Sequence, residues 1–116
     1  MPNYRVHDAG VAHARELIDA GRYDDTTEWS EAAPSAAQQN EEREDEGQEG
    51  YAEWHLAVDE SKGEGTKGRY RFPYGDFSTV NRAALIHAEQ RASQNDHPEI
   101  ARVAKELLER LDAKRS

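Results

Sequence analysis

The FPYGD turn, residues 72–76, is the one place in the sequence where aromatic rings, a glycine and a carboxylate gather. Any small-molecule pocket is therefore expected to border Tyr74, Asp76 and Trp54. A structural role is the alternative, because Asp76 can cap a helix and the aromatic rings can cover an alanine-rich helical face. We favour the structural role, which requires no ligand.

The five histidines raise the question of a metal site, because imidazole is a common metal ligand. They are at positions 7, 13, 55, 87 and 97. No two of them have the i, i+4 or HExxH spacing that places two ligands on one helical face. A site would need residues that converge from separate helices, so we predict no metal site.

The glycines of KGEGTKG, residues 62–68, superficially resemble a phosphate-binding loop. The GxxxxGK[ST] spacing is missing and no buried strand is expected before them, so a flexible loop is the better interpretation. Ser61, Ser78 and Thr79 each lie where a cap or loop residue is expected, and nothing selects a nucleophile among them. We predict no catalytic residue, no cofactor, and a protein that is not an enzyme.

Five basic residues interleave with Tyr70 and Tyr74, a pattern that could stack on and neutralise a nucleic acid strand. These residues are Lys67, Arg69, Arg71, Arg82 and Arg91. The same residues could equally form a solvated face.

The elements that must position these groups follow from residue periodicity. Tyr70, Phe72 and Tyr74 alternate with Arg71 and Pro73, which predicts a short extended segment. Because proline cannot donate to a ladder of backbone hydrogen bonds, this segment is expected at a sheet edge at best.

A helix is predicted to begin near Phe77, with Asp76 as its cap, and to present a mostly alanine face. Ile86 lies about 180° from Phe77, so it is either covered by the fold or offered to a partner. A second helix follows from residue 98, with Asp96 and Glu99 as a capping box and an aliphatic stripe. The short link between them predicts an αα-hairpin.

Two further helices are predicted. Residues 9–20 have the buried stripe Val11, Ala14, Leu17 and Ile18 and end at Gly21. Residues 48–58 place Tyr51, Trp54, His55 and Val58 on one helical face. We therefore predict a mainly α fold: a small helical domain with a C-terminal αα-hairpin and a short extended aromatic segment before it.

Charge divides the single domain of 116 residues, whose net charge is −9. Residues 24–60 hold thirteen acids against Arg43 alone, whereas residues 61–116 hold eleven bases against eight acids. Repulsion among the acids predicts that residues 24–50 form an acidic, mobile segment, although Pro34 could open a polar helix there. Residues 51–116 together with the helix at 9–20 form the predicted core, onto which Tyr23 and Trp29 can anchor.

The composition of the chain indicates the cellular compartment in which it works. The chain has no cysteine and no run of 18 apolar residues, and its first residues lack the apolar core of a signal peptide. We expect a cytoplasmic protein without membrane contact. Adaptation to a high-salt cytoplasm, which acidic protein surfaces suit, is another explanation for the negative net charge.

Three blocks carry a resemblance to a known family: DAGVxHA at residues 8–14, YAEWHL at 51–56 and FxYGDFxxVxR at 72–82. In this order they resemble a family of small, uncharacterised bacterial proteins, whose lack of an assigned activity means that the resemblance implies no functional residue. Residues 72–92 also resemble short helical segments of phage morphogenesis proteins, which implies an assembly or adaptor role.

Two function classes follow. The favoured one is a protein-interaction or adaptor module with an unknown protein partner, because tyrosine, tryptophan and arginine tend to anchor interfaces. The alternative is a nucleic-acid-associated accessory factor that uses the basic C-terminal half. The candidate interaction surface consists of Trp54, Arg69, Tyr70, Arg71, Tyr74, Asp76, Arg82, Ile86 and Arg91.

Overall fold

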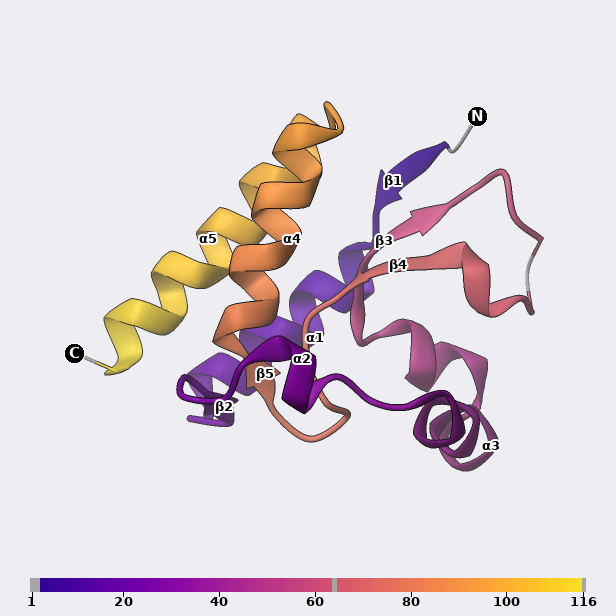
Figure 1. The fold of residues 1–116 in the computed structure, drawn as a ribbon, viewed down its shortest axis with the longest axis horizontal. Coiled ribbons are helices and arrows are strands. Elements are labelled where there is room, and N and C mark those ends of the chain that lie inside the picture. The colour runs from indigo at the N-terminus through magenta and orange to yellow at the C-terminus, as the bar shows by residue number, and fades with distance from the viewer. Residues whose placement is uncertain (1–2, 64, 116) are drawn as a thin grey trace.

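The structure is a computed structural model that describes residues 3–63 and 65–115, so Glu64 in the glycine-rich loop lies outside the described residues. Figure 1 shows the arrangement of its elements. In chain order they are β1 (Tyr4–Val6), α1 (Asp8–Asp19), β2 (Tyr23–Asp24), α2 (Trp29–Ala32), α3 (Ala36–Ala52), β3 (His55–Asp59), the 3₁₀ turn η1 (Lys67–Arg69), β4 (Tyr70–Pro73), β5 (Val80–Asn81), α4 (Arg82–Gln94) and α5 (Pro98–Arg115).

The fold is mixed α and β, which corrects the mainly α class predicted from the sequence. Strands β1, β3 and β4 form an antiparallel sheet in that order, and β2 pairs with β5 in parallel. Val58 lies at the centre of the three-stranded sheet, opposite Arg5 on one side and Tyr70 on the other. The prediction that the aromatic segment is an edge strand is confirmed for β4.

Strand β3 is the element that sequence periodicity misassigned. The helix predicted over residues 48–58 ends instead at Ala52, and the chain continues as a strand from His55 to Asp59. All five strand residues are buried. A central strand covered on both faces lacks the alternation of apolar and polar residues that identifies half-buried strands, so its pattern also fits a helix.

The beginning of α4 also differs from the prediction. Asp76 accepts hydrogen bonds from the backbone of Ser78 and Thr79 (3.0 and 2.7 Å) and so stabilises a turn. The helix begins five residues later than expected, at Arg82, where the side chain of Asn81 accepts from the Ala84 backbone at 2.8 Å. Aspartate and asparagine are both good caps, so residue type alone did not choose between them.

The core lies where α1 and the α4–α5 hairpin pack against the three-stranded sheet (Figure 1). Helix α1 buries the predicted stripe of Val11, Ala14, Leu17 and Ile18. Leu56 of β3 and the fully buried Tyr74 join the same cluster. No helix among the described residues is long and apolar enough to cross a lipid bilayer.

The acidic segment contains α2 and α3, and it joins the rest of the fold largely through side chains. Helix α3 begins with a capping box between Ser35 and Gln38, and it buries only Tyr51 and Ala52. Arg43 donates to the Gly65 carbonyl at 2.7 Å, and another hydrogen bond connects α3 to β4. These contacts hold a polar helix beside the sheet, where it can form one wall of a cleft.

Candidate interaction cleft

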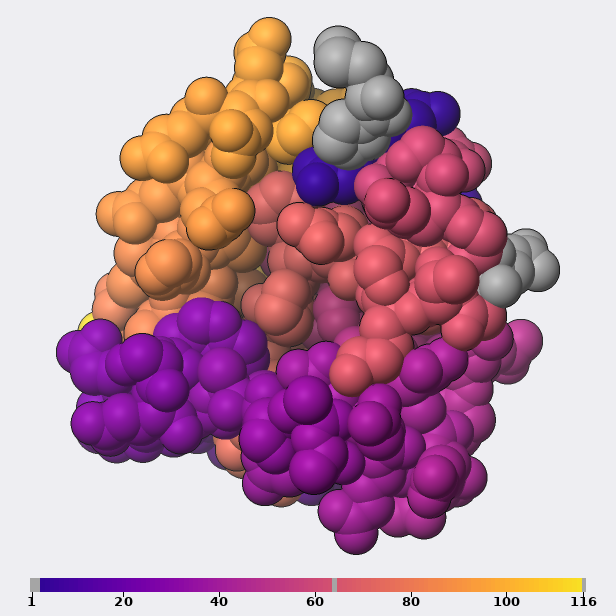
Figure 2. Space-filling view, turned by 45° about the vertical axis from the view of Figure 1, so that its right-hand side comes forward, coloured from indigo at the N-terminus to yellow at the C-terminus, as the bar shows by residue number. Residues whose placement is uncertain are grey.

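A cleft of about 970 Å³ lies between α4, β4 and the segment that contains α2 and the start of α3. Figure 2 shows the hollow, with α4 in orange on one side, β4 in salmon on the other and the acidic segment in purple below. Its lining residues are Tyr4, Trp29, Ala33, Pro34, Gln39, Tyr51, His55, Lys67, Gly68, Tyr70, Arg71, Phe72, Pro73, Gly75, Phe77, Ala84, His87, Ala88, Arg91, Asn95 and His97.

Aromatic side chains form much of this lining, and they support one another. The ring of Tyr51 lies 5.8 Å from that of Tyr70 and 5.9 Å from that of Phe77, and Tyr4 meets Phe72 edge to face at 5.7 Å. Such pairs are worth about 0.5–1.5 kcal/mol beyond the apolar area they bury. The cleft therefore offers rings that are already held in place.

Small residues of α4 explain why the space is open. Ala84 and Ala88 face the cleft, and their methyl groups leave room that larger side chains would fill. The sequence predicted the alanine face and assigned it to packing within the fold, against the next helix or under the aromatic rings. In the structure the face both packs in the core and lines the cleft, because the same two alanines are buried at the core boundary.

Two of the aromatic lining residues have an unusual backbone conformation. Phe72 has φ of 60° and Phe77 has φ of 70°, in the left-handed region that bulky residues rarely adopt. Each such residue costs of order 1–3 kcal/mol and persists only where its surroundings enforce it. Both residues line the cleft, so local backbone strain is concentrated at this site.

The charge of the cleft is opposite to that of the chain. Lys67, Arg71 and Arg91 line it, and no aspartate or glutamate does so among the residues that the structure describes. Lys67 donates to the neutral side chain of Asn40 at 3.2 Å, and the guanidinium of Arg71 lies 5.9 Å from the ring centre of Tyr4. Neither contact neutralises a positive charge.

His55 is a buried imidazole at the edge of this cleft. Burial lowers its pKa from 6.5 to about 4, and although the hydrogen bonds to backbone act in the opposite direction, the imidazole remains neutral at pH 7. Its Nδ1 lies 3.1 Å from the Tyr51 carbonyl, to which it donates. The ring also packs against Tyr51 and Tyr70.

Two other histidines, His87 and His97, line the cleft as well. Within residues 3–63 and 65–115, no group of three or more His, Asp or Glu side chains is arranged to hold a metal ion. The cleft can therefore offer aromatic faces, imidazoles and cations to a ligand.

Three of the nine residues predicted for an interaction surface meet in the cleft: Tyr70, Arg71 and Arg91. Trp54 and Tyr74 instead belong to the core, with exposed fractions of 6% and 0%. They stack on each other at 5.5 Å, so neither is available to a partner in this structure.

The other four predicted residues lie outside the cleft. Asp76 stabilises its own turn, and Arg69 donates to the Lys62 carbonyl at 2.8 Å. Arg82 forms a bidentate pair with Asp112 at 2.8 and 3.1 Å. Ile86 is half-buried on α4.

Most aromatic lining residues were not among those predicted for the surface. Tyr4, Trp29, Tyr51 and Phe77 come from four separate segments of the chain. Only the tertiary fold brings them together. Trp29 was expected to anchor onto the core but not to line a surface site, because an isolated tryptophan in a polar segment usually packs against another part of the molecule.

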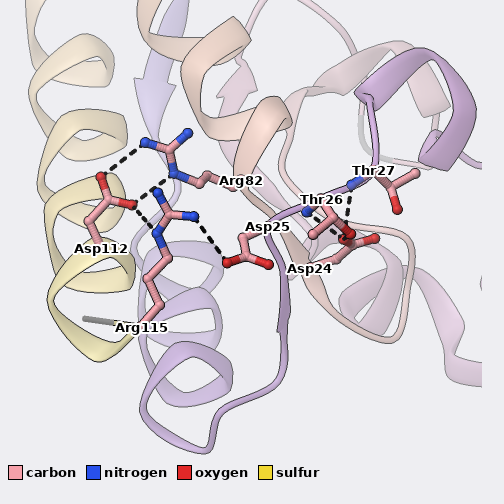
Figure 3. Close-up of polar contacts among 7 residues, drawn as sticks. All are labelled: Asp24, Asp25, Thr26, Thr27, Arg82, Asp112 and Arg115. Carbon is pink, nitrogen blue, oxygen red and sulfur yellow. Dashed lines mark hydrogen bonds and ion pairs between the residues drawn. The ribbon is translucent and has the colours of Figure 1, made fainter.

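A polar network outside the cleft fixes the start of the acidic segment (Figure 3). Arg115 pairs with Asp25 at 3.0 Å and with Asp112 at 3.2 Å, and Asp112 also binds Arg82. The guanidinium of Arg82 lowers the pKa of Asp112. Next to it, hydrogen bonds from Thr26 and Thr27 lower the pKa of Asp24. This network ties the chain just before Trp29 to α4 and α5.

No family model, curated protein or solved structure matches the chain. Function must therefore be argued from the geometry of the cleft.

Proposed function

We propose that this protein is a non-enzymatic, cytoplasmic protein-interaction or adaptor module, and that its cleft receives a segment of the partner. The observation that carries the proposal is that one cleft of about 970 Å³ is lined by packed aromatic rings and also by basic side chains that form no ion pair with a described residue. Tyrosine, tryptophan and arginine dominate the energetics of protein interfaces, because they combine large contact area with hydrogen bonding. The volume is at the upper end for small-molecule sites, which suits a short peptide segment.

The second candidate is a nucleic-acid-associated accessory factor. The observation in its favour is that Arg71 and Arg91 line the same cleft as the rings of Trp29 and Tyr70, on which bases could stack. Against it, Arg69 and Arg82 are engaged within the fold, and the chain carries a net charge of −9. We therefore favour a protein partner.

Site-specific photocrosslinking in the native cytoplasm tests this choice. We would replace His87, which is exposed and lines the cleft, with p-benzoylphenylalanine. The expected result is one discrete adduct that survives nuclease and disappears with protease. The same crosslinker at Arg15, which is exposed on α1 and outside the cleft, is the matched control and should not give that adduct.

Two outcomes contradict the proposal. An adduct that nuclease removes would indicate the nucleic-acid alternative. Equal labelling from positions 87 and 15 would mean that the cleft has no special role.

A further inference from the structure

We infer that the segment bound in the cleft is a short acidic peptide that carries a large aromatic or aliphatic side chain. This inference rests on the proposed function and adds the chemistry of the partner. Its basis is charge complementarity: the chain has a net charge of −9, yet Lys67, Arg71 and Arg91 line the cleft without a described carboxylate beside them.

The charges of Arg71 and Arg91 are not neutralised by a carboxylate of the described residues. Arg5, Arg82, Arg110 and Arg115 each form an ion pair with a carboxylate of the chain. Neither Arg71 nor Arg91 forms an ion pair with any residue that the structure describes, and both are exposed. Arginine binds carboxylates through two parallel hydrogen bonds, so an acidic side chain is the natural partner for each.

The two arginines come from opposite walls of the cleft. Arg71 is on β4 and Arg91 is on α4, and Figure 2 shows these two elements on either side of the hollow. The lining of the same cleft also includes Phe72, Phe77 and Ala88. An acidic peptide can thus place carboxylates at both walls while one large apolar side chain covers the rings between them.

Recognition depends on side chains, because the free edge of β4 is a poor template for another strand. Pro73 has no backbone N–H to donate, and Phe72, with φ of 60°, leaves the extended conformation. Pairing of a partner's backbone with β4 therefore supplies few hydrogen bonds. The specificity of the cleft lies in its charges and rings.

The size of the positive region favours a peptide over a nucleic acid strand. Beyond the cleft, α3 presents the exposed acids Glu41, Glu44, Asp45 and Glu46. A polyanionic backbone that extends past the cleft toward these acids is repelled by them, over a range set by the Debye length of about 8 Å at physiological salt. A short peptide bound between β4 and α4 need not extend to these acids.

Selection from a displayed library of random heptapeptides, with the full-length protein as bait, tests the inference. We expect enrichment of sequences in which aspartate or glutamate flanks a tryptophan, phenylalanine or leucine. The best peptide, labelled with fluorescein, should bind about tenfold more weakly to Arg71→Gln and to Arg91→Gln, because each loses a charge-assisted hydrogen bond. Arg15→Gln is the matched control and should bind with unchanged affinity.

Each other outcome overturns the inference. Absence of enrichment, enriched peptides without acids, or equal binding to all variants would show that the cleft does not select acidic peptides. Displacement of the peptide by a single-stranded oligonucleotide, with equal dependence on Arg71 and Arg91, would show that nucleic acid is the ligand. If crosslinking at position 87 still captures a protein while the library yields acid-poor peptides, the proposed function stands and only the acidic chemistry is wrong.

Discussion

Tyr74 shows how one buried hydroxyl can organise the residues around it. The hydroxyl donates to the Glu53 carbonyl at 2.6 Å and accepts from His13 Nδ1 at 2.9 Å. Burial raises the pKa of Tyr74 well above its usual range, so the side chain stays neutral. The residue thereby connects α1, the end of α3 and the turn before α4.

Removing that hydroxyl should destabilise the fold. Tyr74→Phe leaves the Glu53 carbonyl and His13 without their partner, and we expect the free energy of unfolding to fall by about 1–3 kcal/mol. Urea denaturation measures this change. Tyr70→Phe, which loses only a hydrogen bond from Gln48 near the surface, is the control and should cost less. Equal costs for the two variants would contradict the role assigned to Tyr74.

His55 should make stability depend on pH between about 4 and 6.5. Its folded-state pKa is about 4, below the unfolded value of 6.5, so the unfolded chain binds more protons in this interval. The contribution of the neutral His55 to the free energy of unfolding is therefore fully present above pH 6.5. It decreases as the pH falls, by about 3 kcal/mol when the whole interval is crossed.

The measurement compares unfolding free energies at pH 7 and pH 4 for the wild type and His55→Gln. Glutamine can still donate to the Tyr51 carbonyl but does not titrate. The variant should lose less stability than the wild type over this interval. Parallel pH profiles for the two proteins would contradict a neutral, buried His55.

At the residue scale, the sequence prediction included some residues of the cleft lining and not others. Tyr70, Arg71 and Arg91 could be predicted, because tyrosine and arginine on an edge strand and a helix surface commonly form interfaces. Trp54 and Tyr74 could not be placed, because aromatic residues are equally typical of cores. Only the distant partners His13 and Glu53 decide that Tyr74 is internal.

Among the long helices, α3 gains the least stability from burial, because it buries only Tyr51 and Ala52. Its exposed acids repel one another, and burial raises the pKa of Glu42 with further help from Glu46 and Asp45. Gly47, with φ of 74°, interrupts the helix. We expect residues 24–50 to be the most mobile part of the chain.

Native-state hydrogen exchange tests this expectation. Amides of α3 should exchange faster than those of α5, which buries Ile100, Ala104, Leu107 and Leu111 in the core. Ser35→Ala, which removes the helix cap, should accelerate exchange in α3 further and leave α5 unchanged. Exchange in α3 as slow as in α5 would contradict the expected mobility.

The elements differ in how far sequence determines them. Helices α1 and α5 could be predicted because each has a long aliphatic stripe with a period of 3.6 residues. Strand β3 could not, because its pairing with β1 and β4 and its contacts with α1 and α5 come from other parts of the chain. The late start of α4 depends on the hydrogen bonds that Asp76 makes within its own turn.

At the scale of the whole molecule, opposite charges are separated in space. The acidic segment contributes the neutral residues Trp29, Pro34 and Gln39 to the cleft, while the exposed acids of α3 lie outside its lining. The sequence shows the separation along the chain, but it cannot show which face of the acidic segment borders the basic residues. Because the acidic segment presents only neutral side chains to the cleft, the cleft has a net positive charge although the protein is acidic.

The most direct test of the interaction cleft is an amide chemical-shift map of the ¹⁵N-labelled protein, titrated with the segment of the photocrosslinked partner. We predict that shift changes concentrate at residues 67–77 and 84–97, extend to Trp29, and need about tenfold more ligand to reach the same size in Arg91→Gln. Arg15→Gln should retain the wild-type map. Shift changes centred on α5 and α1, with the cleft residues unaffected, would contradict the assignment of the cleft as the binding site.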